Sequence, residues 1–415
     1  APSRDATPAH ALDLDGTFGL HPRAAALHQL FRRGELTILP AVGSPANNRS
    51  HFAQQDSWET GVLGDTIGAD GWLNRHLRST QGHGPLRAVH IGAAMPRLLR
   101  GEAPVTVIRN VADLAYQNRF GDPRAIQGHL ERLYGGSERV PSGGEARDAA
   151  RELAEATGRR TLEGLRTLET IGRTPYAPAE DANYPASGLA AQLQSVAQLI
   201  KAGIGLEVAH IDFGGWDTHS NQGIDGGGTF GERLQTLSDA IAAFMRDLGE
   251  RREHVLLMTL TEFGRTAEEN GTRGTDHGHA SAAFLVGGAI SAATSGGKLL
   301  GDWPGLAPEL LNQRRDLVHT VDFRDMIVEV MNRHLGNGDY ASLMPTHAPE
   351  AVGVLPAENA VPAHATGRAL PGGAPPLDDL DEECGPDDDD TPLVCPDTGA
   401  LLPPPARPSR RPRRD

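Results

Sequence analysis

Cysteine is almost absent from this chain of 415 residues, because its only two cysteines, Cys384 and Cys395, lie near the carboxyl end. The rest of the sequence therefore offers neither a thiolate ligand for a metal ion nor a catalytic cysteine. Aromatic residues are also scarce, at 5% of the chain, against 38% for all hydrophobic residues. A chain of this length can bury a sizeable core, which we expect to consist mainly of Ala, Val, Ile and Leu.

An excess of positive charge is also lacking. The formal net charge is −15, which argues against non-specific nucleic-acid binding because such binding needs a cationic face. No stretch approaches the roughly 18 to 20 consecutive apolar residues of a transmembrane helix. Residues 1–30 lack a basic start followed by an apolar run. We therefore expect no signal peptide, and a soluble chain that is cytoplasmic, processed or truncated.

Short apolar runs predict buried strands at intervals along the chain. These runs are Leu36–Val42, Leu86–Ile91, Val105–Ile108, Leu206–Phe213, His254–Thr261 and Ala282–Val286. Apolar residues at helical spacing predict helices over Arg23–Arg33, Ala146–Leu168, Gly188–Ala202, Thr229–Arg251 and Val321–Leu335. The alternation predicts the α/β class, with a mostly parallel sheet covered by helices on both faces.

The composition changes at about residue 345. We expect residues 1–345 to form one domain, with a helical insertion at about 135–185 that follows a Gly, Ser and charge-rich loop. Residues 346–415 are rich in Pro, Gly, Ala and Asp and hold few large apolar side chains. Such a segment cannot bury enough apolar surface to offset its chain entropy, so we expect a disordered low-complexity tail.

The first group of candidate ligands follows the predicted strand Leu206–Phe213. It reads DFGGWDTH over residues 212–219, in which Asp217 offers a hard oxygen and His219 an imidazole nitrogen. Open α/β sheets bind ligands at the carboxyl ends of their strands, and glycines let the backbone approach a ligand. The alternative interpretation is a turn with a solvated Asp and a capping His.

Two more groups lie beside predicted strands. Glu262 and Arg265 belong to TLTEFGRT at 259–266, where the alternative is a helix-start carboxylate with a solvated Arg. Asp276, His277 and His279 belong to GTDHGHAS at 274–281, just before the strand Ala282–Val286. So dense a set of donors favours a ligand or catalytic role. His90 and His319 stand alone in the sequence and are interpreted as packing or surface residues.

The fourth group is NNRSHF at 47–52, after the strand Leu36–Val42. Ser50 is placed as the N-cap of a following helix, where its hydroxyl meets free N–H groups. A metal-activated Ser50 hydroxyl could attack a phosphorus or sulfur centre while Arg49 holds the anion. The alternative is a plain cap beside a surface His.

Six motifs together resemble the domain-of-unknown-function family numbered 1501. They are FGLHP at 18–22, AVGSP with NRSHF at 41–52, DGWL at 70–73, GGWDTH at 214–219, TEFGRT at 261–266 and TDHGHA at 275–280. The resemblance runs from about Leu12 to about Leu335. It implies an exported bacterial protein, periplasmic or extracellular, that commonly uses the twin-arginine route and is similar in fold to alkaline phosphatases and sulfatases.

The resemblance also implies a metal site. Asp217 and His219, with His279 or His277, would hold one divalent ion, and Glu262 would stand where a second ion has its carboxylate. Ser50 would match the nucleophile. Phe263 stands where phosphatases typically have a metal-binding His, and the family's first strand, with a further acidic residue, is expected to be missing from this sequence.

These features lead to a main functional hypothesis and two alternatives. The main one is a metal-dependent hydrolase of small phosphate or sulfate esters, with zinc, calcium and magnesium as candidate ions. A second is a non-catalytic exported protein that binds a surface ligand or takes part in surface assembly, keeping the fold and one ion. The third is an anion-binding module that uses Arg49 and Arg265 without a metal.

Overall fold

The computed structural model describes residues 2–3, 10–64, 68–82, 86–111 and 158–356, without 160–161, 165, 224–226, 289 and 292–293. The internal contacts of the chain divide it into Ala1–Ala374 and Pro375–Asp415, and the second unit lies outside the described residues. Most of the predicted helix Ala146–Leu168 also lies outside them, although residues 166–173 are helical. Within the described residues, no helix combines the length and the apolar character needed to cross a bilayer.

Each of the six predicted strands has a counterpart in the structure. The strands are β1 (Pro2–Ser3), β2 (Ala11–Asp13), β3 (Gly19–Leu20), β4 (Leu36–Gly43), β5 (Ala88–Ile91), β6 (Thr106–Ile108), β7 (Val208–His210), β8 (Leu256–Met258), β9 (Ser281–Gly287) and β10 (Val321–Asp322). The helices are α1 (Ala25–Arg32), α2 (His51–Thr60), α3 (Trp72–Ser79), α6 (Gly188–Lys201), α7 (Gly228–Leu248), α8 (Phe323–Arg333) and α9 (Tyr340–Leu343). Short 3-10 helices are η1 (Pro22–Ala24), η2 (Arg97–Leu99), η4 (Gly249–His254) and η5 (Pro308–Leu310).

The described strands form three small sheets, so the predicted mostly parallel, alkaline phosphatase-like sheet is wrong. The four-stranded sheet has the order β10-β4-β9-β8, with β9 antiparallel to both β4 and β8. The sheet β6-β5-β7 is parallel, whereas β1-β2-β3 is mixed. The physical reason lies in residues 259–280, which form loops instead of the crossover helix that a parallel pair requires.

Strand β4 is buried on both faces, which explains why its sequence is almost entirely apolar. Leu36 and Ile38 pack into a core with α1, α6 and α7, while Leu39 and Val42 pack into a second core with α8. The pairing of β4 with β9 shifts register between Leu39 and Val42. Pro40 lies within this irregularity, and proline cannot donate a ladder hydrogen bond.

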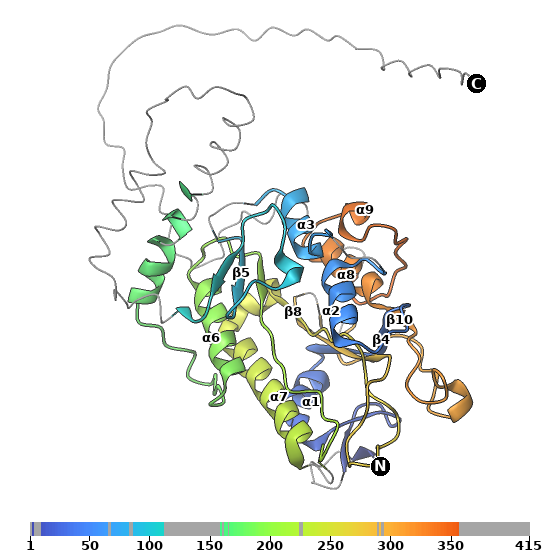
Figure 1. Ribbon diagram of the computed structural model, residues 1–415. Helices are drawn as coiled ribbons and strands as arrows, with labels where there is room; N and C mark the ends of the chain where they lie inside the picture. Colours follow the sequence, from blue (N-terminus) through green and yellow to red (C-terminus); the bar gives the residue numbers. More distant parts are fainter. Residues whose placement is uncertain are drawn as a thin grey trace, which may run out of the picture. The chain divides into compact units, whose positions relative to one another are not determined.

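Helices lie over both cores. Figure 1 shows α6 and α7 side by side, and α7 contacts α1 as well. On the other side, Trp58 of α2 stacks on Phe323 of α8, with ring centroids 4.2 Å apart. This stack holds the second half of α2 and so fixes the helix whose first residue is His51.

The folded part of the chain continues past residue 345, after which a disordered tail was expected. Val354 and Leu355 are buried in the second core. The backbone N–H groups of Val352, Gly353 and Leu355 donate to the carboxylate of Glu329 on α8. The predicted tail from residue 357 onward lies outside the described residues.

A buried carboxylate joins α6, α7 and the segment between residues 174 and 187. Asp247 accepts hydrogen bonds from Lys201 at 2.5 Å, from the hydroxyls of Tyr176 at 2.5 Å and Tyr184 at 2.9 Å, and from the N–H of Ala179 at 2.8 Å. Burial alone would raise the pKa of Asp247, but these hydrogen bonds outweigh it and hold the pKa below its ordinary value.

We predict that Asp247→Ala lowers the free energy of unfolding by about 3 to 5 kcal/mol at pH 7, because it leaves the Lys201 charge without its buried partner. The depressed pKa means that this contribution is present above the unfolded-state pKa of about 3.9 and fades as the pH falls below it. Urea unfolding of both proteins at pH 7 and at lower pH measures the difference. The exposed pair of Arg173 and Glu169 provides the control, since Glu169→Ala should cost at most about 1 kcal/mol. An equal effect of the two substitutions would contradict the prediction.

Candidate metal centre

The candidate centre lies where three strand ends of the four-stranded sheet meet. Val42 pairs with Ser281, so the end of β4 lies beside the start of β9. Because β8 is antiparallel to β9, the end of β8 lies toward the same edge. The segments that leave or enter the sheet there carry His51, Glu262 with Arg265, and Asp276 with His277. The loop after β7, in the parallel sheet, brings Asp217 and His219 to them.

Backbone contacts hold these loops together without regular secondary structure. Arg265 and His277 form an isolated antiparallel bridge. The N–H of Thr275 donates to the carbonyl of Thr218 at 3.1 Å, which ties the loop after β7 to the segment before β9. At Gly274 an added Cβ would lie 2.3 Å from a backbone carbon of His219, so only glycine permits this approach.

His51, Asp217 and His277 form the inner cluster, with one potential ligand atom from each lying within 4.8 Å of the others. His277 Nε2 lies 3.0 Å from Asp217 Oδ1, and His51 Nε2 lies 3.4 Å from Asp217 Oδ2. His219 extends the cluster, because its Nε2 lies 2.9 Å from Asp217 Oδ1 and 2.9 Å from His277 Nε2. The three imidazoles therefore turn the same ring nitrogen toward one carboxylate.

The other ring nitrogen of each imidazole meets an acceptor. His277 Nδ1 lies 2.8 Å from the carbonyl of Arg49, which can only accept, so this nitrogen donates. His51 Nδ1 lies 2.6 Å from Glu262 Oε1, and His219 Nδ1 lies 3.0 Å from Asp276 Oδ1. In neutral imidazoles this pattern places each proton on Nδ1 and leaves the inward Nε2 with a lone pair.

Asp217 is kept ionised by its surroundings. Its partial burial would raise its pKa, but the neighbouring Arg265, His277 and His219 outweigh burial and lower the pKa to about 2. Arg265 donates to Asp217 Oδ1 at 2.6 Å and to the carbonyl of Thr275. The pKa of Asp276 is also lowered, first by its hydrogen bond from Asn270 and then by the one from His219.

The geometry of the cluster fits a divalent transition metal ion. Two ligands at about 2.0 to 2.1 Å from one ion, at angles between 90° and tetrahedral, lie roughly 2.9 to 3.4 Å apart, and the inward contacts have these lengths. His51 Nε2 is buried and has no hydrogen-bond partner among the described residues. Imidazole nitrogens and a carboxylate oxygen are donor types that bind divalent metal ions in proteins.

The structure sorts the metal candidates from the sequence into three places. Asp217 and His277 lie in the inner cluster, with His219 beside them. Glu262 and Asp276 bind the outer nitrogens of His51 and His219, so they orient ligands. His279 lies elsewhere: its Nε2 is 2.8 Å from His319 Nδ1, and burial followed by the His319 charge lowers its pKa to about 4.

The three proposed catalytic residues also differ in position. Arg265 lies at the cluster, but Arg49 turns its guanidinium to the buried carboxylate of Asp316 at 3.0 Å and contributes its carbonyl instead. Ser50 occupies the N-cap position of α2 and is exposed, and its side chain makes no capping hydrogen bond to the described helix. Ser50 lies between two residues that contact the cluster, because the His51 side chain faces Asp217 and the Arg49 carbonyl accepts from His277.

Two features were missed from the sequence. His51 received no functional role and was a surface residue in the alternative interpretation of its segment, although its place at the start of a helix after a strand end indicated this edge of the sheet. His90, interpreted as a packing residue, forms a second cluster with His210 and Asp212. Its signal was weaker, because His90 and His210 are far apart in sequence and meet only by strand pairing.

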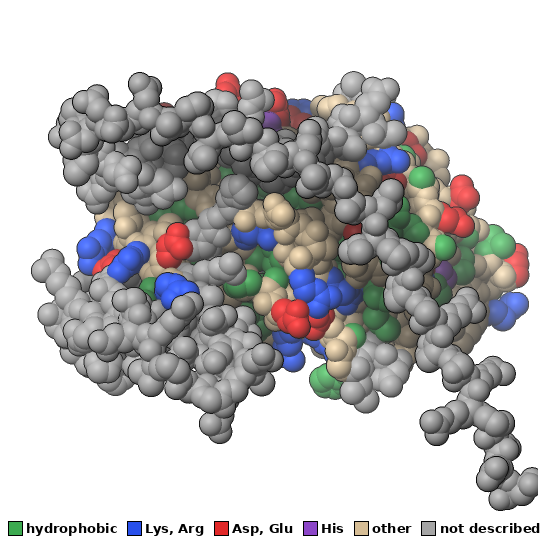
Figure 2. All heavy atoms as spheres, turned by 90° about the horizontal axis from the view of Figure 1, so that it is seen from above, with side chains coloured by type: hydrophobic (Ala, Val, Ile, Leu, Met, Phe, Trp, Pro, Cys, Tyr) green, Lys and Arg blue, Asp and Glu red, His purple; other side chains and the backbone are tan. Residues whose placement is uncertain are grey.

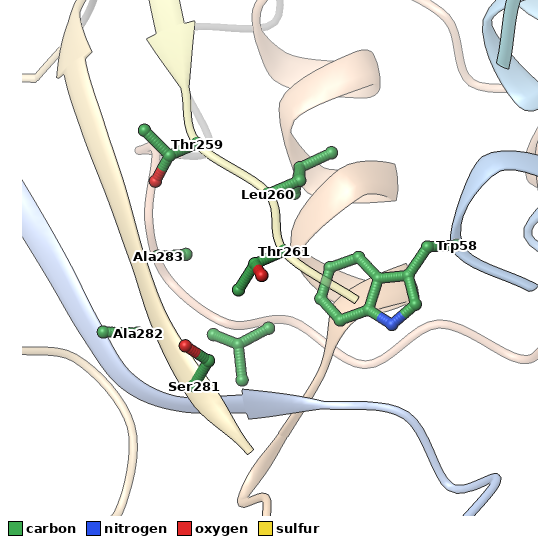
Figure 3. A pocket seen from close by; sticks show the side chains of 8 residues that line it. Trp58, Thr259, Leu260, Thr261, Ser281, Ala282 and Ala283 are labelled. Atoms are coloured by element: carbon green, nitrogen blue, oxygen red, sulfur yellow. The ribbon is translucent and has the colours of Figure 1, made fainter. Parts of the chain in front are cut away.

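The hollow beside the sheet edge has no ionisable side chain in its lining, and the described residues form no large patch of one charge on the face drawn in Figure 2. Figure 2 shows basic and acidic side chains interspersed on one face instead of gathered into a patch of one sign. The hollow in Figure 3 lies between α2 and the ends of β4 and β9, and Trp58, Thr261 and Ser281 are among its lining residues. Its polar side-chain groups are hydroxyls and the indole N–H of Trp58, so it provides no charged ligand.

Comparisons with known proteins identify a family. No curated protein and no solved structure matches the chain. Residues 14–344 match the family described as "Protein of unknown function (DUF1501)". The matched region is most of the chain and includes the inner cluster and the residues around it. The chain therefore belongs to the DUF1501 family.

Proposed function

We propose that this protein is a metal-dependent hydrolase of small anionic esters, with a zinc ion held by His51, Asp217 and His277 and with His219 beside them. One observation carries the proposal. Three imidazoles each meet an acceptor at Nδ1 and turn Nε2 toward the carboxylate of Asp217, so in their neutral form they present lone pairs inward. Acceptors that face one another need a cation between them. Among the acceptors of this cluster, the Arg265 guanidinium donates only to Asp217.

The arrangement leaves the cluster open to a substrate. The side chains of Asp217 and His219 are 46% and 43% exposed, so the site faces solvent instead of being a closed structural centre. Zinc with an open coordination position supplies a Lewis acid and activates water at neutral pH. Glu262 and Asp276 orient the ligands, and Arg265 provides a positive charge beside an anionic ester.

Ser50 is the proposed nucleophile because of where the chain places it. It lies between Arg49 and His51, whose carbonyl and imidazole both belong to the centre. Its hydroxyl is exposed and makes no capping hydrogen bond within the described helix. A serine activated beside a metal ion could attack the phosphorus or sulfur atom of an ester, forming a Ser50 ester as the bond to the alcohol breaks and the serine proton passes to the departing alcohol. Water would then hydrolyse the Ser50 ester, and Arg265 could stabilise the charge that develops in both steps.

A binding protein that holds the metal without catalysis is the second candidate. The observation in its favour is that both arginines of the sequence hypothesis already have carboxylate partners, Arg49 with Asp316 and Arg265 with Asp217. This candidate and the hydrolase share the metal centre and differ in turnover. Export from the cytoplasm stays a prediction that rests on the resemblance.

We predict that the purified protein binds zinc and that His51→Ala and His277→Ala each abolish binding at the centre, because each removes an inward nitrogen. Elemental analysis after dialysis against zinc measures the loss. His254→Ala, at an exposed histidine outside the cluster, is the matched control and should bind as the original protein does. Undiminished zinc binding by both cluster variants would refute the centre.

We further predict that Glu262→Gln weakens zinc binding by roughly 10- to 100-fold, because the amide orients His51 less firmly and makes its nitrogen less basic. Competition with a chelator gives the affinity. Glu268→Gln, at an exposed position on the same segment, is the control. Equal affinities of the two variants would mean that the hydrogen bond between Glu262 and His51 does not support a metal ligand.

Catalysis is tested with Ser50→Ala and three chromogenic substrates: p-nitrophenyl phosphate, p-nitrophenyl sulfate and bis(p-nitrophenyl) phosphate. We expect the zinc-loaded protein to hydrolyse at least one, and Ser50→Ala to reduce hydrolysis to the buffer rate with zinc still bound. The free energy of unfolding should change by no more than about 0.5 kcal/mol, since no capping bond is lost. Zinc binding without hydrolysis of any substrate would instead support the binding protein.

A further inference from the structure

A second histidine cluster lies at the carboxyl edge of the parallel sheet. His90 of β5 pairs in register with His210, the last residue of β7, and Asp212 follows two residues later. One potential ligand atom from each residue lies within 4.8 Å of the others. Carboxyl ends of parallel strands are where α/β sheets bind ligands, and the candidate metal centre described above uses none of these side chains.

The hydrogen bonds of His90 determine which nitrogen faces the carboxylate with a lone pair. His90 Nδ1 lies 3.2 Å from the carbonyl of His210, which can only accept, so Nδ1 carries the proton. The Nε2 atom of a neutral His90 is then an acceptor. It faces Asp212 Oδ2, another acceptor, at 3.9 Å, a separation beyond hydrogen-bonding distance.

His210 completes the arrangement. Its Nε2 lies 3.7 Å from the other oxygen of Asp212, and the two imidazoles stand close together, with their Nδ1 atoms 3.0 Å apart.

A glycine makes room for the His90 ring. A Cβ on Gly92 would lie 2.0 Å from His90 Nε2, so any larger residue would displace this nitrogen. Because Gly92, directly after β5, has no side chain, the space beside His90 Nε2 stays open. The side chain of His90 is only 2% exposed and that of Asp212 is 73% exposed, so an ion could enter from the side of Asp212.

We infer that His90, His210 and Asp212 form a second divalent transition-metal site, separate from the centre at His51, Asp217 and His277. Two imidazoles and one carboxylate are ligands that suit zinc. Asp212 begins the loop that carries Asp217 and His219, so an ion held here ties the start of that loop to β5 and β7. The inference is independent of the proposed hydrolysis.

The test counts zinc ions per chain by elemental analysis after equilibrium dialysis. The original protein should bind two, and Asp212→Asn should bind one, because the amide is a poorer ligand than the carboxylate. Asp212 is exposed, so this substitution should leave folding intact. Asp302→Asn, at another exposed aspartate, is the control and should keep both ions.

A second pair of variants separates the two sites. His277→Ala, which disables the first centre, should keep one ion and should still gain thermal stability from zinc. His277→Ala combined with Asp212→Asn should lose both the ion and the gain. If Asp212→Asn binds as many ions as the original protein, the second site is refuted, and a proton on His90 is the cation that faces Asp212. If the original protein binds one ion and Asp212→Asn none, the second site stands and the first centre fails.

Discussion

The candidate centre depends on the antiparallel pairing of β9 with β4 and β8. This pairing puts the start of β9 at the same edge as the ends of its two neighbours. His277 therefore comes close to His51, which in turn contacts Glu262, although these residues come from three separate segments. In a parallel sheet the start of β9 would lie at the opposite edge, and the same side chains would be a strand length apart.

The parallel direction predicted for the strands is wrong, yet the three segments meet at one edge of the sheet. One cause explains both results. Apolar runs predict that strands exist, and all six predicted runs contain a strand. They carry no information about direction, which depends on whether a connection is a crossover helix or a loop. Because residues 259–280 form loops, β9 runs antiparallel to β8, and this direction brings Glu262 and His277 to the same edge of the sheet.

The chemistry of the centre arises from contacts around the ligands as much as from the ligands. Glu262, Asp276 and the Arg49 carbonyl each hold the outer nitrogen of one imidazole. Those bonds decide which nitrogen faces inward, and in neutral imidazoles they leave three lone pairs directed at one carboxylate. The loop from Asp212 to His219 then links this centre to the second cluster, because it contributes a carboxylate to each.

The candidate ligands were recognisable from the sequence alone, because Asp, Glu and His form dense groups beside the predicted strands. These groups include Asp217 and His277. The sequence could not separate ligands from the residues that orient them, because Glu262 and Asp217 look alike until their partners are known. It placed His279 with His277 because the two are neighbours in sequence, yet the backbone turns their rings to different partners. Only the tertiary structure brought His51, and the pair His90 and His210, to their carboxylates, since strand pairing joins residues that no sequence spacing connects.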